Sequence, residues 1–96
     1  MNIYVDIDNT ICKTNGMDYM GAKPIKENIN KINKLFQDGN QITYWTARGS
    51  VSKINYYNLT LDQLNKWGCK FHSLSVGLKP PYDLLICDKS IRIEEL

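Results

Sequence analysis

Two aspartates one residue apart, Asp6 and Asp8, follow a short apolar segment near the start of the chain. That segment, residues 3–5, consists of β-branched and aromatic residues and predicts a buried strand. Alternate residues of a strand point to the same side, so both carboxylates are expected to face one place. Such a pair favours a bound cation or a shared proton, and Mg²⁺ prefers oxygen ligands of this kind. The simpler alternative is that Asp8 or Asn9 caps a turn.

Other chemically capable side chains lie next to two later apolar segments. They are Thr46 and Arg48 after residues 41–46, Lys79 in the loop before residues 83–87, and Asp88 after residues 83–87. Ligands of parallel α/β sheets bind beyond the carboxyl ends of the strands. We therefore expect these groups to meet the paired aspartates at one edge of a sheet.

The segments between these groups alternate between strand and helix patterns. Apolar residues at spacings of four, three and four predict a helix over 24–38. A second helical stripe covers 51–67, with a fresh start near Thr60, where Thr60 and Gln63 match a capping box. Residues 71–76 predict a weaker strand. This alternation predicts a parallel sheet with helices on both faces.

Residues 9–22 show no sustained period and contain two glycines. They predict a loop or small flap that projects from the end of the first strand. Its larger side chains, Met17, Tyr19 and Met20, could line the entrance of a site or pack within the flap, and of these alternatives we expect packing. No segment of the chain is long enough to form a separate cap domain.

Length and composition indicate one soluble domain. The chain has 96 residues, of which 43% are hydrophobic and 23% charged, as in an ordinary globular domain. A net charge of +2 neither demands nor excludes a nucleic-acid partner. No apolar run approaches a membrane span, and the three cysteines form no C-x-x-C pair. We expect a cytoplasmic protein without a membrane partner.

The combined set of carboxylates, a hydroxyl, a lysine and an arginine is suited to phosphoryl transfer. Mg²⁺ favours phosphate oxygens, and cationic side chains stabilise the charge of a transferring phosphoryl group. A carboxylate can act as the nucleophile, while a second one protonates the leaving oxygen and later activates water. Gly49 and Ser50, at the start of the predicted second helix, add backbone N–H groups that favour anions.

The motifs resemble those of the haloacid dehalogenase superfamily over nearly the whole chain. They are D-x-D-x-T at 6–10, the threonine after the second strand, a later lysine and a final aspartate. The segments ITYWTARG (42–49) and KPPYD (79–83) are similar to those of small capless phosphatases assigned to capsular-polysaccharide biosynthesis. The resemblance implies a three-layer α/β/α Rossmannoid fold with about four mostly parallel strands, spanning 1–96 as one domain without a cap.

The resemblance also implies roles for individual residues. Asp6 would be the nucleophile and Asp8 the general acid and base. Mg²⁺ would be held by Asp6, the backbone carbonyl of Asp8, and Asp88. The predicted phosphate-binding residues are Asn9, Thr46, Ala47, Arg48 and Lys79, of which Arg48 is our addition from its position in the chain.

One departure from the family pattern concerns Cys87. Relatives usually place two consecutive acidic residues before the lysine at the end of this strand, whereas here Cys87 precedes Asp88. Hard Mg²⁺ gains little from a soft sulfur ligand. If the second acid is the metal ligand, Asp88 keeps this role and Cys87 alters only its surroundings; if the first acid is the ligand, the metal site is weakened. We favour the first case.

The expected function is a Mg²⁺-dependent phosphomonoester hydrolase that acts on a small phosphorylated metabolite, for example a sugar phosphate. A polynucleotide or nucleotide end-phosphatase and a non-catalytic phosphate-binding module stay open as alternatives. Because a small open site needs shielding from water, we also expect a homo-oligomer.

Overall fold

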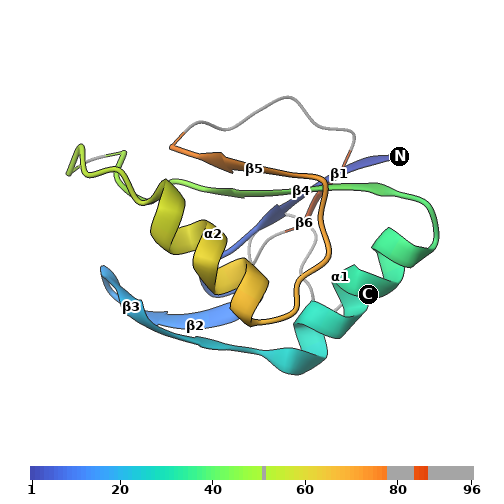
Figure 1. Ribbon diagram of the computed structural model, residues 1–96, viewed down its shortest axis with the longest axis horizontal. Coiled ribbons are helices and arrows are strands. Elements are labelled where there is room, and N and C mark those ends of the chain that lie inside the picture. The colour runs from blue at the N-terminus through green and yellow to red at the C-terminus, as the bar shows by residue number, and fades with distance from the viewer. Residues whose placement is uncertain (51, 78–83, 87–96) are drawn as a thin grey trace.

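The computed structural model describes residues 1–50, 52–77 and 84–86. Their elements follow one another as shown in Figure 1. In chain order they are β1 (Asn2–Asp6), β2 (Cys12–Asn15), β3 (Asp18–Pro24), α1 (Lys26–Gln37), β4 (Gln41–Thr46), α2 (Tyr57–Lys66), β5 (Ser73–Val76) and β6 (Leu84–Ile86). None of the helices in these residues is long and apolar enough to cross a membrane.

The main sheet is parallel and has the strand order β5-β4-β1-β6. β1 lies between β4 and β6, and its last residue, Asp6, is in register with Trp45 of β4. The carboxyl ends of β1 and β4 therefore lie side by side, which brings the residues after both strands together (Figure 1). The predicted mixed α/β class with a mostly parallel sheet is confirmed, whereas the three-layer arrangement stays a prediction.

The core forms because β1 alternates between buried and partly exposed side chains. Ile3, Val5 and Ile7 are buried, whereas Asp6 and Asp8, on the other side of the chain, are only partly covered. The buried apolar side chains of one face of α1 and one face of α2 pack into the same core, together with residues of β4 and β6. These residues are Ile29, Ile32, Ile42, Tyr44, Leu64, Trp67 and Ile86.

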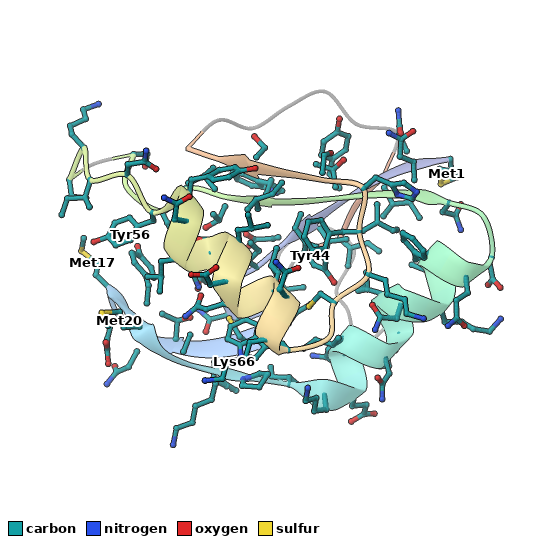
Figure 2. The ribbon with its side chains drawn as sticks, in the orientation of Figure 1. Met1, Met17, Met20, Tyr44, Tyr56 and Lys66 are labelled. Atoms are coloured by element: carbon teal, nitrogen blue, oxygen red, sulfur yellow. The ribbon has the colours of Figure 1, made fainter. Side chains whose placement is uncertain are left out.

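The segment after β1 is more regular than the sequence predicts. β2 and β3 form an antiparallel hairpin in which Lys13 is in register with Lys23. Met17 and Met20 are 62% and 82% exposed, so the expected packing of these two methionines is wrong. Figure 2 shows both at the end of the hairpin, on the same side of the molecule as Tyr56. Tyr19, in contrast, is partly buried.

α2 begins later than the apolar stripe predicts. The helix starts at Tyr57, whose backbone N–H donates to Asn55 Oδ1 at 2.9 Å. Gly49 and Lys53 have φ angles of +83° and +63°, which a right-handed helix does not allow. The capping box predicted at Thr60 is also wrong, because Thr60 lies inside the helix and is fully buried.

α1 matches its prediction more closely. It covers Lys26–Gln37 against a predicted 24–38, and Gly39 follows it with a φ of +98°. Pro24 belongs to the end of β3 rather than to the first helical turn. The Ile25 backbone N–H donates to Ile11 O at 2.8 Å and so ties the start of α1 to the segment after β1.

Candidate active site

Asp6 and Asp8 open onto one pocket of about 470 Å³ at the carboxyl ends of β1 and β4. β1 ends at Asp6, and a turn follows in which Thr10 N–H and Ile11 N–H both donate to Ile7 O. Because Ile7 is fully buried, the residues on either side of it face away from the core. The other described residues that line the pocket are Met17, Tyr19, Trp45, Thr46, Ala47, Arg48, Gly49, Ser50 and Ser52.

The carboxylate of Asp8 accepts hydrogen bonds from three directions. Arg48 donates from Nη2 to Oδ1 at 2.7 Å and from Nε to Oδ2 at 3.0 Å. Thr14 of β2 donates to Oδ1 at 2.6 Å, and Thr46 of β4 lies 3.3 Å from Oδ2. The Cys12 thiol lies 3.8 Å from Oδ1. Asp8 is thereby fixed in one orientation by the hairpin and by β4.

Arg48 is a buried cation with a partner on every side of its guanidinium. Its side chain is fully inaccessible, and Nη1 donates to Thr60 Oγ1 at 3.1 Å and to Gln63 Oε1 at 2.6 Å. The Tyr19 ring covers the guanidinium, with its centroid 4.8 Å from Cζ. A buried charge is tolerated only when it is paired and hydrogen-bonded, and Arg48 meets both conditions.

This pairing controls the charge state of Asp8. Burial alone would raise the pKa of Asp8, but the hydrogen bonds from Arg48 and Thr14 outweigh burial and lower it from its usual value of 3.8. Asp8 is therefore a carboxylate near neutral pH. An anion in this position can accept a proton from water or from a substrate hydroxyl.

Asp6 differs from Asp8 in its surroundings. Its Oδ1 accepts the backbone N–H of Ile7 at 2.9 Å, and its side chain is partly exposed in the pocket. Asp8, in contrast, is paired with Arg48. The two carboxylates thus stand in different environments, which suits them to different chemical tasks.

The four predicted phosphate-binding residues that the structure describes divide into three groups. Thr46 and Ala47 line the pocket, and Thr46 Oγ1 also accepts the Arg48 backbone N–H at 3.2 Å. Arg48 lines the pocket with its guanidinium committed to Asp8, so a phosphate contact from Arg48 would require that pair to open. Asn9 is exposed in the turn, with a φ of +63°, and is outside the described lining.

Lys79, Cys87 and Asp88 lie outside the described residues, so their predicted roles stay predictions. Within residues 1–50, 52–77 and 84–86, no three His, Cys, Asp or Glu side chains gather as a metal site. Among the predicted Mg²⁺ ligands, Asp6 supplies a carboxylate in the pocket. Asp8 has its carboxylate engaged with Arg48 and Thr14, which agrees with a ligand role for its backbone carbonyl alone. The donors are oxygens, as Mg²⁺ requires.

Tyr19, for which the sequence leaves a position at the entrance of the site open, covers the Arg48 guanidinium and lines the pocket. The sequence does not predict that Thr14, Thr60 and Gln63 belong to the site, yet each contacts Asp8 or Arg48. A signal existed for two of them, because Thr60 and Gln63 are three residues apart and share the α2 face that buries Leu64. Polar residues on a buried helical face need partners, and here the partner is Arg48.

Comparisons with known proteins find a structural similarity and no family or curated match. No family model matches the chain, and no curated protein matches it. A solved structure of a protein from Vibrio cholerae, which carries a target designation and no stated activity, superposes with a TM-score of 0.78. The two share 26% identity over 99% of this chain and 86% of the other. The similarity in fold therefore extends over nearly all of this chain and most of the other protein.

Proposed function

We propose that the chain is a Mg²⁺-dependent phosphomonoester hydrolase of the haloacid dehalogenase type, which works through an aspartyl-phosphate on Asp6. The observation that carries this proposal is the shared pocket of Asp6, Asp8 and Thr46 at the carboxyl end of a parallel sheet. The D-x-D-x-T motif at residues 6–10 supports it. The three-layer α/β/α arrangement and a cytoplasmic location belong to the same proposal.

The reaction proceeds in two displacements. A carboxylate oxygen of Asp6 attacks phosphorus, the bond from phosphorus to the ester oxygen breaks, and Asp8 gives a proton to the departing oxygen. Asp8 then removes a proton from water, which attacks the aspartyl-phosphate and releases inorganic phosphate and free Asp6. Thr46 donates a hydrogen bond to the phosphoryl oxygens in both steps, for which its hydroxyl must turn away from Asp8 Oδ2.

Arg48 supports the second step through its effect on Asp8. With its pKa lowered by Arg48 and Thr14, Asp8 is the anion that must accept the proton of the attacking water. For the first step Asp8 must take up a proton against the same ion pair. The pairing thus favours the step in which Asp8 acts as a base.

The metal would be bound by Asp6, the backbone carbonyl of Asp8, and Asp88. Mg²⁺ would neutralise charge on the phosphoryl oxygens and orient them for attack. Lys79 would add a second positive charge at the same group.

The lining of the pocket favours a small substrate over a nucleic acid. Among the described lining residues the only cation is Arg48, and it is already paired with Asp8. Met17, Tyr19, Trp45 and Ala47 give the wall an apolar character. Binding of a nucleic-acid strand relies on several cations aligned with its phosphates. A small phosphorylated metabolite fits this wall better.

The test is phosphate release from a panel of phosphomonoesters with and without Mg²⁺. The wild-type chain is compared with Asp6→Asn and with Asp62→Asn, an exposed aspartate of α2 that serves as the matched control. Asp6→Asn is expected to lose turnover by about a thousandfold or more, as for removal of a nucleophile. The control should retain wild-type activity.

Full turnover by Asp6→Asn would show that the nucleophile is assigned wrongly. Calorimetric binding of vanadate with Mg²⁺, combined with no turnover of any ester by the wild type, would instead identify a non-catalytic phosphate-binding module.

A further inference from the structure

Gln63 of α2 connects two parts of the site that the sequence separates. Its Oε1 accepts from Arg48 Nη1 at 2.6 Å, and its Nε2 donates to the backbone carbonyl of Tyr19 at 2.6 Å. Gln63 is only 9% exposed. One buried amide therefore contacts both the hairpin and the arginine that holds Asp8.

The orientation of this amide is fixed by its partners. A guanidinium can only donate, so the group facing Arg48 must be the amide oxygen. A backbone carbonyl can only accept, so the group facing Tyr19 O must be the amide nitrogen. Neither a carboxylate nor an apolar side chain of the same length meets both demands. Glutamine is thus the residue type that fits this position.

The hairpin that Gln63 holds acts on Asp8 directly. Thr14 of β2 donates to Asp8 Oδ1 at 2.6 Å, while the ring of Tyr19 on β3 covers the Arg48 guanidinium. Tyr19 also packs edge-on against Tyr56 next to α2, with ring centroids 4.9 Å apart. The hairpin therefore contacts Asp8, Arg48 and the segment next to α2 at the same time.

We infer that Gln63 is a positioning residue, which holds the hairpin against α2 and keeps the Arg48 guanidinium in place beside Asp8. It touches neither carboxylate and acts through Arg48 and the hairpin. The inference rests on the proposed function for its effect on catalysis, and on the contacts alone for its effect on the hairpin.

The consequence for catalysis is a loss of alignment rather than of substrate affinity. Small misplacements of a catalytic group lower the rate by up to about a hundredfold. Removal of the amide should therefore lower kcat by about tenfold to a hundredfold, while KM changes by less than about threefold. A merely structural residue would lower the amount of folded enzyme and leave kcat per folded molecule unchanged.

Two substitutions separate the two contacts of Gln63. Gln63→Glu keeps an acceptor for Arg48 but turns an oxygen toward Tyr19 O, so it releases the hairpin. Gln63→Met has a similar length and removes both hydrogen bonds. Gln37, an exposed glutamine near the end of α1, provides the matched controls Gln37→Glu and Gln37→Met.

The experiment measures steady-state hydrolysis of 4-nitrophenyl phosphate with Mg²⁺ and amide hydrogen exchange of residues 12–24. We expect lower kcat in both Gln63 variants and exchange in the hairpin about tenfold faster, because both variants lose the neutral hydrogen bond from Gln63 Nε2 to Tyr19 O. Exchange in α1 and β4 should stay at the wild-type rate, and both Gln37 variants should match the wild type throughout.

Two results overturn the inference. One is wild-type hairpin exchange in Gln63→Met, which would show that the amide does not hold the hairpin. The other is faster exchange spread evenly over all elements, with unchanged kcat per folded molecule, which would make Gln63 only a contributor to global stability. If the wild type hydrolyses no phosphomonoester, the proposed function is wrong. The exchange rates of the hairpin then still show whether Gln63 holds the hairpin.

Discussion

Both carboxylate oxygens of Asp8 accept hydrogen bonds from the guanidinium of Arg48, at 2.7 Å to Nη2 and 3.0 Å to Nε. The pair joins the end of β1 to the end of β4, which are neighbours in the sheet. Two parallel hydrogen bonds fix the plane of the carboxylate as well as its place. Arg48 therefore fixes the orientation of the Asp8 carboxylate in this structure.

The first prediction concerns the stability that this pair supplies. Arg48→Met leaves Asp8 without its cation and is expected to lower the free energy of unfolding by about 2–4 kcal/mol. The loss should stay below that of a fully enclosed pair because the Asp8 side chain is 21% exposed. The stability of Arg48→Lys should lie between those of the wild type and Arg48→Met, because a single ammonium group cannot make both of the hydrogen bonds of the planar guanidinium. Urea denaturation at neutral pH measures the free energy of unfolding of the wild type and both variants.

Lys34→Met is the control for this comparison. Lys34 and Asp38 also form a 2.7 Å ion pair, but their side chains are 69% and 49% exposed. Its loss should cost at most about 0.5 kcal/mol, as for surface pairs on a helix. Equal effects of Arg48→Met and Lys34→Met would mean that burial of the Arg48 pair contributes nothing.

The second prediction is a pH dependence that originates at Asp8. The pKa of Asp8 is below its usual 3.8 in the folded chain, because hydrogen bonds from Arg48 and Thr14 outweigh the effect of burial. As the pH falls, the unfolded chain binds a proton at Asp8 before the folded chain does, so acid favours unfolding. The contribution of Asp8 is complete above its usual pKa and is lost as the pH falls through the lowered folded value.

Asp8→Asn provides the comparison because it cannot titrate. The stability difference between wild type and Asp8→Asn should be constant from pH 7 to about pH 5 and should shrink below about pH 4. A difference that already declines between pH 7 and pH 5 would contradict a lowered pKa for Asp8.

The third prediction is low reactivity of two thiols. Burial raises the pKa of Cys69 to about 11, and burial together with the charge of Asp8 raises the pKa of Cys12. Only the thiolate reacts with alkylating agents, so Cys69 should react about a hundredfold more slowly than an exposed cysteine at pH 8, and Cys12 should also react more slowly than an exposed cysteine. Mass spectrometry after a short treatment with iodoacetamide measures each site.

The same treatment in urea should modify both cysteines rapidly, which separates protection by the fold from slow chemistry. Rapid labelling of Cys12 in the folded chain would indicate that the hairpin next to Asp8 opens frequently.

The sequence predicts the parts of this fold that depend on local periodicity. The β-branched and aromatic residues 3–5 predict β1, and the two-residue period of a strand predicts that Asp6 and Asp8 face one place. The sequence does not predict the hairpin, because β2 is mostly polar and β3 contains Gly21 and Pro24, which are residue types that strands disfavour.

The network around Asp8 could not be predicted in the same way. Asp8 and Arg48 are 40 residues apart, and their contact depends on β1 lying next to β4. Thr60 and Gln63 have the spacing of a capping box, which is also the spacing of two neighbours on one helix face. Only the position of Arg48 distinguishes these alternatives, and that position is a property of the whole fold.

The fourth prediction concerns Gly49, next to Arg48 in the loop that leads to α2. Its φ is +83°, and a Cβ at this position would lie within contact distance of the Ile54 backbone carbonyl, too close for any side chain. Gly49→Ala must therefore adopt an unfavourable backbone conformation and displace residues that lie beside the pocket. We expect a loss of about 2–4 kcal/mol in unfolding free energy and reduced turnover.

Gly39→Ala separates strain from crowding. Gly39 also has a positive φ, +98°, but an added Cβ would meet no atom within 4 Å. Replacement of Gly39 should lower the free energy of unfolding by about 1 kcal/mol, which is the cost of a positive φ for alanine. Turnover should stay unchanged, because Gly39 lies at the far end of α1 from the pocket. If both alanine variants lose the same stability, the close approach of Gly49 to Ile54 is not a constraint, and the loop beside Arg48 tolerates a wider path.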